Sequence, residues 1–270
     1  MESVKIKQLS VSVDNSEIIS DLSLDINRGD VIALLGPNGH GKSTLFHAIL
    51  GNELYKVNSG DILFDGESIL DKKTDERSRM GIFLAFQNPP EIPGVLTMDF
   101  LKSSIDAHSE KPLSIYNFYK EVTSAYKRVS LDENFINRNL NDAFSGGEKK
   151  RNEILQMLLL KPQLALLDEI DSGLDVDSIK IIADIINEMR EKGTTFIVIS
   201  HYQKLLDLIK PNRSAILVNG RIALEGDYSI AKRISQEGYG FLKKEYGVNI
   251  EKKESKQVLL GSCAVKNIYE

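Results

Sequence analysis

Cysteine is almost missing from this chain of 270 residues, which contains only Cys263. A single thiol excludes an internal disulfide and any metal site built from several cysteines. It therefore removes the small, disulfide-stapled secreted proteins from the possible classes. A reducing compartment is the simplest expectation, and we predict a cytoplasmic protein.

Long apolar runs are also missing, and no stretch approaches the roughly 18–20 residues that span a bilayer. The first residues, Met1–Lys5, show neither an apolar signal core nor an arginine-rich targeting pattern. Basic residues are not in excess, because 34 Lys and Arg stand against 39 Asp and Glu, a formal net charge of −5. A nucleic-acid partner usually requires a basic face. We therefore expect no membrane span and no nucleic acid.

The apolar pattern that is present predicts an α/β protein. Alternating residues at 4–13 and 22–26 predict half-exposed antiparallel strands near the N-terminus. Continuous apolar runs, as in residues 31–35, predict parallel strands covered on both faces. Residues 97–160 are mainly helical in pattern, with no convincing strand. The predicted architecture is a mainly parallel sheet core with an N-terminal antiparallel β-subdomain and a helical subdomain inserted at about 88–160.

One loop carries the strongest chemical signal. It reads Gly-Pro-Asn-Gly-His-Gly-Lys-Ser and matches the phosphate-binding pattern G-x-x-x-x-G-K-[ST], between a predicted strand and a predicted helix. Its glycines let the backbone curl round phosphates, and the helix N-terminus adds positive partial charge. Lys42 should reach the β/γ-phosphates, and the Ser43 hydroxyl should bind Mg²⁺. The predicted nucleotide-binding residues are Gly36, Pro37, Asn38, Gly39, His40, Gly41, Lys42, Ser43 and Thr44.

Two carboxylates follow another buried run. Leu164–Leu167 predicts a strand, and Asp168 and Glu169 come directly after it. Asp168 is placed to hold Mg²⁺ through water, and Glu169 to act as general base on the attacking water. A strand end with two solvated acids is the plain alternative, and the loop at Gly36 favours the functional interpretation.

Two further segments fit hydrolysis of a nucleoside triphosphate. Ser145, Gly146 and Gly147 precede a predicted helix, whose N-terminus can receive a phosphate. Because one chain already supplies a cradle, a second anion-binding end makes sense if it faces the γ-phosphate of another copy. By itself, Ser-Gly-Gly is more often a plain loop and N-cap. His201 follows the predicted strand 196–199. Ligands bind at such strand ends, which favours a site role over capping or packing.

Over about residues 1–240, the chain resembles the nucleotide-binding domain of the ABC ATPase superfamily. Residues 36–43 resemble Walker A, residues 145–148 the signature motif, Asp168 and Glu169 Walker B with its catalytic glutamate, and residues 172–175 the D-loop. Gln87 resembles the Q-loop glutamine, and His201 the switch histidine. The resemblance implies a transient head-to-tail homodimer that holds two ATP molecules between Walker A of one subunit and the signature of the other.

This resemblance also implies roles for individual residues. Gln87 would sense the γ-phosphate, bind Mg²⁺ and link to the partner-docking surface, and His201 would hold the γ-phosphate and the attacking water. The implied cofactors are ATP and Mg²⁺. One departure concerns Val13, where the family commonly has an aromatic residue that stacks on adenine; Tyr55 is a possible substitute. The implied sets are Glu169, His201 and Gln87 for catalysis, Ser43, Gln87 and Asp168 for the metal, and Ser145, Gly146, Gly147 and Asp175 for the nucleotide across the dimer.

Finer details resemble one branch of the superfamily, the SufC-type ATPases of iron–sulfur cluster assembly. Ile170-Asp171 stands where most transporter ATPases have Pro-Thr, and residues 83–95, 145–153 and 200–202 are closer to SufC. The resemblance implies SufB and SufD as scaffold partners, docked near Phe86–Val95, although that stretch also reads as a proline-rich connector. A cluster scaffold needs several thiolates, so the partners would hold the cluster.

Two alternatives and a domain division complete the predictions. The chain could instead be the nucleotide-binding subunit of an ABC transporter. A regulatory ABC protein acting on ribosomes fits less well, because that class usually carries two ATPase domains and this chain has one Walker A. We expect an ABC ATPase domain over residues 1–250 and a C-terminal tail over 251–270, with Cys263 an incidental thiol in that tail.

Overall fold

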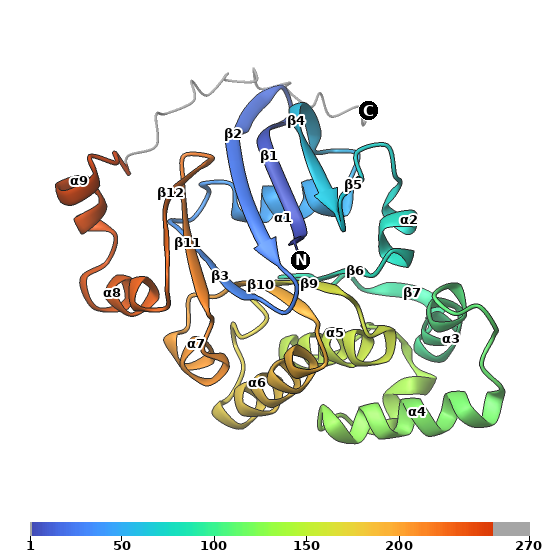
Figure 1. Ribbon diagram of the computed structural model, residues 1–270. Coiled ribbons are helices and arrows are strands. Elements are labelled where there is room, and N and C mark those ends of the chain that lie inside the picture. Colours follow the sequence, from blue (N-terminus) through green and yellow to red (C-terminus); the bar gives the residue numbers. More distant parts are fainter. Residues whose placement is uncertain (1, 251–270) are drawn as a thin grey trace, which may run out of the picture.

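The computed structural model describes residues 2–250; the predicted tail at 251–270 and Cys263 lie outside the described residues. Two sheets stack with one helix between them, and further helices cover the larger sheet on its other face (Figure 1). The predicted α/β architecture, with a mainly parallel core and an N-terminal antiparallel sheet, is confirmed.

The larger sheet has six strands in the order β12-β11-β3-β10-β9-β6, and only β12 runs antiparallel to its neighbour. Asn219 and Gly220 join β11 to β12 with φ values of 49° and 76°, the two positive values that a tight hairpin turn of this kind requires. The strands are β3 (Val31–Leu35), β6 (Ile82–Ala85), β9 (Leu164–Asp168), β10 (Thr195–Ile199), β11 (Arg213–Val218) and β12 (Arg221–Gly226).

The smaller sheet is antiparallel, in the order β2-β1-β4-β5. Its apolar alternation changes phase between Ile6 and Leu9, and there the register of β1 shifts at a bulge, with Gln8 at a φ of 45°. The bulge returns both apolar sets to one buried face. The strands are β1 (Glu2–Val13), β2 (Ser16–Asn27), β4 (Lys56–Phe64) and β5 (Glu67–Ser68).

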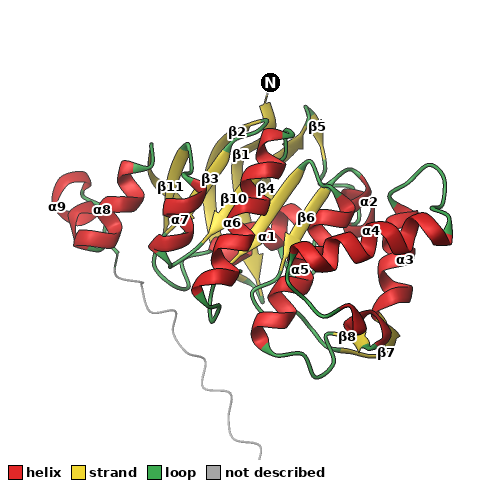
Figure 2. Cartoon of the chain, turned by 90° about the horizontal axis from the view of Figure 1, so that it is seen from below, coloured by secondary structure: helices red, strands yellow, loops and turns green. Residues whose placement is uncertain are grey.

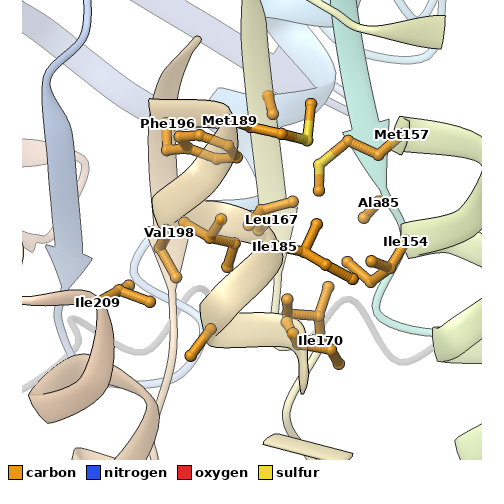
Figure 3. Close-up of a cluster of buried hydrophobic side chains, with 14 of the residues drawn as sticks. Ala85, Ile154, Met157, Leu167, Ile170, Ile185, Met189, Phe196, Val198 and Ile209 are labelled. Atoms are coloured by element: carbon orange, nitrogen blue, oxygen red, sulfur yellow. The ribbon is translucent and has the colours of Figure 1, made fainter. Parts of the chain in front are cut away.

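The two faces of the six-stranded sheet belong to different cores. One face packs with α1 (Lys42–Leu50) against the smaller sheet. The other packs against α5 (Gly146–Leu160), α6 (Val176–Glu191) and α7 (Gln203–Ile209). In Figure 3, Ile185 and Met189 of α6 reach toward Leu167 and Val198 of the strands. Burial on both faces explains why these strands read as unbroken apolar runs.

Helices fill the chain between β6 and β9. They are α3 (Thr97–Ala107), α4 (Ile115–Arg128), the short 3-10 helix η1 (Glu133–Asn137) and α5, while α2 (Thr74–Arg79) precedes β6. The expectation of no strand at 97–160 is wrong at β8 (Asn139–Leu140), which pairs with β7 (Ile92–Leu96). Two residues are too few to show alternation, and their partner lies over 40 positions away. Figure 2 shows this pair beside α3, at the end of the molecule opposite α8.

The last described elements, α8 (Ser229–Glu237) and α9 (Gly240–Tyr246), lie beyond β12 at the edge of the larger sheet (Figure 1). Phe241 and Leu242 of α9 are buried in the same core as α5 and α6. Across residues 2–250, none of the helices is both long and apolar enough to cross a membrane.

Candidate active site

Three neighbouring parallel strands bring the predicted site residues to one edge of the sheet. β3 leads into the loop at Gly36, β9 ends at Asp168, and β10 is followed at once by Ser200 and His201. The pairing aligns these ends, because Ile199 lies opposite Asp168 and Val198 lies opposite Ala33. Segments more than 130 residues apart therefore meet at the carboxyl edge, where α/β sheets bind ligands.

The loop between β3 and α1 depends on glycine at two positions. Gly36 has a φ of 148°, and a Cβ there would lie 2.1 Å from the backbone oxygen of Leu217, so no side chain fits. Gly41, which has no side chain of its own, caps α1 at a φ of 109°, and no side-chain hydrogen bond to this helix end is found within residues 2–250. The first amides of α1 thus carry no side-chain cap, which suits them to a phosphate.

Lys42 lies in the middle of this cradle. It is buried, and its Nζ donates to the backbone oxygens of Gly36 at 2.7 Å and Pro37 at 3.1 Å. Burial lowers the pKa of Lys42, while the nearby charges of Glu169 and Asp168 oppose that shift. A desolvated ammonium group held by carbonyls is positioned to exchange these weak partners for phosphate oxygens.

His40 uses its side chain inside the protein. Its Nδ1 accepts from the backbone N–H of Asn219 at 3.0 Å, and its backbone oxygen accepts from Gly220 N–H at 3.1 Å. The ring is therefore committed to the β11–β12 hairpin. His40 therefore stays a predicted nucleotide-binding residue through its backbone position in the loop. Its imidazole ring instead stabilises the loop by its bond to the hairpin.

Asp168 and Ser43 form the part of the site that suits a cation. The Ser43 hydroxyl donates to Asp168, and Oδ1 of Asp168 is buried without a hydrogen-bond partner among residues 2–250. Burial raises the pKa of Asp168, with the Glu169 charge adding to the effect. An orphaned buried carboxylate oxygen beside a hydroxyl fits Mg²⁺, which takes few protein ligands and completes its shell with water and phosphate.

Glu169 brings the three predicted catalytic residues together. Nε2 of Gln87 donates to Oε2 of Glu169 at 2.7 Å, and Nε2 of His201 lies 3.3 Å from Oε1. Glu169 has a φ of 48°, a left-handed conformation that is uncommon outside glycine. This turn interrupts the alternation of β9 so that Asp168 and Glu169 both reach the same edge.

The predicted signature residues begin a second helix with a different cap. Ser145 caps α5, and its Oγ accepts from Glu148 N–H at 3.3 Å while Glu148 accepts from Ser145 N–H at 2.7 Å. Ser145 and Gly146 are exposed. Asp175 likewise caps α6 by accepting from Ser178 N–H at 2.7 Å. These residues thus lie at helix N-termini on the surface of the chain, where a second copy could contact them.

Tyr55, the possible substitute for the missing aromatic at Val13, follows α1. Its ring stacks on the ring of His47 in the last turn of α1, with centroids 4.5 Å apart. A role for Tyr55 in stacking on adenine stays a prediction.

Comparison with known proteins identifies the family. Residues 19–172, more than half of the chain, match the family model described as ABC transporter. The chain belongs to the ABC ATPase superfamily. This ABC ATPase is 44% identical over 250 residues to a probable ABC transporter ATP-binding protein of Streptococcus pyogenes, a match that covers 92% of this chain and 98% of that protein.

Other comparisons agree. The ABC ATPase is 44% identical over 246 residues to a probable ATP-dependent transporter of Cyanophora paradoxa, covering 88% of this chain and 94% of that protein. Its fold matches a dimeric ATP-binding cassette bound to ADP and Pi with a TM-score of 0.73 at 23% identity, over 83% of this chain and 98% of that one. The chain is an ATP-hydrolysing enzyme.

Sequence reasoning missed one lysine beside the site of this ABC ATPase. Lys150 is buried, and its Nζ donates to the backbone oxygens of Glu169 and Ser172, each at 2.7 Å, and to the Ser172 hydroxyl. Lys150 thus fixes α5 to the turn that carries Glu169. The sequence does place Lys150 within the stretch 145–153. However, two adjacent lysines near the start of a helix are equally typical of a solvent-exposed surface, so the sequence does not single out Lys150.

A second missed connection joins α5 to the segment after β6. Glu153 is buried in α5 and accepts from the backbone N–H of Phe86 at 3.2 Å. Lys149 also pairs with Glu91 at 2.6 Å. The stretch Phe86–Val95, which carries Gln87, is therefore bonded directly to the signature helix of the ABC ATPase.

Proposed function

We propose that this ATPase works as a transient head-to-tail homodimer in which Ser145–Gly147 of one copy faces the phosphate loop of the other. The observation that carries the proposal is the division of the site. One chain holds a complete cradle at Gly36–Ser43, while a second helix end at Ser145 is exposed and, among residues 2–250, forms no hydrogen bond with that cradle. That this fold matches a dimeric ABC transporter cassette supports dimer formation.

Within each site, Glu169 takes the proton from the attacking water. Gln87 and His201 hold its two carboxylate oxygens, so the base is oriented before the nucleotide arrives. Lys42 binds the β/γ-phosphates, and Ser43 with Asp168 would hold Mg²⁺, which neutralises developing phosphate charge when bound. His201 moves from Glu169 toward the γ-phosphate as the dimer closes.

Hydrolysis is coupled to a partner through the stretch Phe86–Val95. A partner that moves this stretch also moves Gln87, and through the Lys149–Glu91 and Glu153–Phe86 bonds it moves α5. Ser145 at the start of α5 then enters or leaves the facing site. Docking of one partner would therefore affect both the proposed base Glu169, through Gln87, and the helix end at Ser145.

For the identity of the partner, we propose SufB- and SufD-type scaffold proteins of iron–sulfur cluster assembly. The support is the sequence pattern at residues 83–95, 145–153 and 200–202, and Ile170-Asp171 in place of Pro-Thr. The second candidate is a membrane subunit of an ABC transporter. The names of the relatives from Streptococcus pyogenes and Cyanophora paradoxa favour that candidate.

The first experiment measures Mg-ATPase activity of the purified chain with and without co-expressed SufB and SufD. Stable co-purification with stimulation of at least about tenfold supports the cluster-assembly role. Normal ATP binding with no complex and no stimulation overturns that role and directs the search to a membrane partner.

The proposed base and dimer are tested by Glu169→Gln. We expect this variant to bind ATP, to lose about 10²–10⁴-fold in kcat, and to form an ATP-dependent dimer in size-exclusion chromatography, because the base is lost and the cradle is kept. Rapid turnover in this variant would remove Glu169 as the base. Turnover without any dimer at high ATP would overturn the shared site.

A further inference from the structure

A tyrosine more than 200 positions away holds the first amide of the phosphate loop. The backbone N–H of Gly36 donates to the hydroxyl of Tyr239 at 3.0 Å. Tyr239 lies directly before α9, packs against the larger core and is partly buried. Burial raises its pKa, so the phenol stays neutral at physiological pH and accepts this bond as a hydroxyl.

The contact fixes a peptide plane next to those that Lys42 uses. Lys42 donates to the carbonyl oxygens of Gly36 and Pro37, which belong to the following two planes. Gly36 has no Cβ to limit rotation, and its Cα faces Leu217 at a distance that no side chain tolerates. The Tyr239 hydroxyl therefore holds the peptide plane at which the chain leaves β3 and enters the loop.

The other end of the loop is held from the same part of the chain. His40 is bonded to Asn219 and Gly220 of the β11–β12 hairpin. The Asn219 side chain in turn donates to the backbone oxygen of Asn249 at 2.9 Å. Residues that follow β11 thus anchor the loop at position 36 and at position 40, on either side of the bend that receives phosphate.

We propose that Tyr239 is a positioning residue that couples the C-terminal helix α9 to nucleotide affinity. Without the hydroxyl, the Gly36 amide loses its partner and the free loop relaxes to find another. Binding must then restore the phosphate-ready shape, so the cost falls on affinity. The hydrolytic groups on β9 and β10 keep their positions, and turnover of the bound complex is preserved.

The test compares Tyr239→Phe with Tyr228→Phe in the full chain. Tyr228, which directly precedes α8, has a hydroxyl that donates to Asp207 and accepts from Gln203, so its removal is the same chemical change without contact to the loop. We expect Tyr239→Phe to raise Kd and KM for ATP by about threefold to tenfold, the effect of one hydrogen bond, with kcat within about twofold. Kd for ADP should rise equally, because the loop also binds the phosphates of ADP.

Tyr228→Phe should leave all these values unchanged. Amide hydrogen exchange at Gly36, measured without nucleotide, should be faster in Tyr239→Phe and unchanged in Tyr228→Phe. The proposal is overturned if Tyr239→Phe binds ATP and ADP like the parent chain, if both variants lose affinity equally, or if kcat falls while Kd does not change.

Discussion

The two helix ends of the proposed site, at α1 and at α5, differ in how their first amides are satisfied. At α1, Gly41 in a left-handed conformation leads into the helix, and no side chain caps the end. At α5, Ser145 and Glu148 form a reciprocal capping box. The contrast shows that similar glycine-rich sequences can form two kinds of helix N-terminus. One leaves its amides available to an anion, and the other caps them with side chains of its own first turn.

This difference separates binding from hydrolysis. The amides of α1 gain a phosphate without losing a side-chain bond, so α1 supplies affinity in one copy alone. The amides of α5 must trade the Ser145–Glu148 bonds for a phosphate, and a nearby carboxylate repels that anion. In the proposed dimer, the α5 end would therefore contribute only when the two copies close over the γ-phosphate.

The largest expected effect comes from removing the cation at the α1 end. Lys42→Ala should weaken ATP binding by at least about 100-fold, because charge-assisted bonds to phosphate are lost from a buried position. Isothermal titration calorimetry measures the Kd. Lys149→Ala removes the same charge at the α5 end and should change Kd by less than about twofold; an equal loss in both variants would erase the contrast.

Blocking the α5 end should separate the two functions. Ser145→Arg should keep Kd for ATP within about twofold but reduce turnover at least tenfold, because the partner's γ-phosphate loses its place at this end. Coupled ATPase assays measure the turnover. Ser114→Arg is the control, because Ser114 caps α4 in the same way, accepting from Asn117 N–H. If Ser145→Arg keeps full partner-stimulated turnover, the shared-site model fails.

A third prediction concerns how α5 is anchored to the segment of Gln87. Burial raises the pKa of Glu153 from 4.5 to about 7, so the folded chain holds a proton there that the unfolded chain releases. The cost of burying the charge is absent near pH 4.5, grows as pH rises, and is complete above about pH 7.

Glu153→Gln mimics the protonated form and keeps an acceptor for Phe86 N–H. It should match the parent chain at pH 4 and raise the free energy of unfolding by roughly 1–3 kcal/mol at pH 8. Urea denaturation at both pH values measures this difference. Glu121→Gln, on the surface of α4, should show no such pH dependence, and equal stabilisation at both pH values would contradict the assignment.

The smallest expected effect tests the capping box itself. Glu148→Ala should cost about 1 kcal/mol of stability through the lost cap, with Kd for ATP unchanged. Glu76→Ala is matched, because Glu76 accepts from Lys73 N–H at 2.7 Å at the start of α2, away from the site. Thermal denaturation should show similar losses, and only Glu148→Ala should alter dimer-dependent turnover, within about threefold.

The parts of the fold that the sequence predicted are those with local signals. Buried runs such as Val31–Leu35 and Leu164–Leu167 are long enough to show their character, and the glycine pattern of the loop needs no distant partner. The phase change between Ile6 and Leu9 even marks the bulge in β1. These features depend on neighbours within a few residues along the chain, so they can be predicted from composition and spacing.

The contacts that complete the site are not local. β8 is a strand because β7 pairs with it, and Tyr239 matters because it meets Gly36 across some 200 positions. Lys150 looks like one more surface lysine until α5 packs on the turn after β9. The spacing of these residues in the sequence does not distinguish them from solvent-exposed side chains, because their partners come close only when the sheet has assembled.

The order of strands along the sheet has a consequence for biosynthesis. The phosphate loop follows β3, but its neighbours β9 and β10 arrive more than 120 residues later. A chain emerging from the ribosome would therefore display its cradle long before Glu169 and His201 join it. Until β10 has paired with β3 and β9 with β10, the proposed base Glu169 has no place beside the phosphate loop, so the base joins its site only late in synthesis.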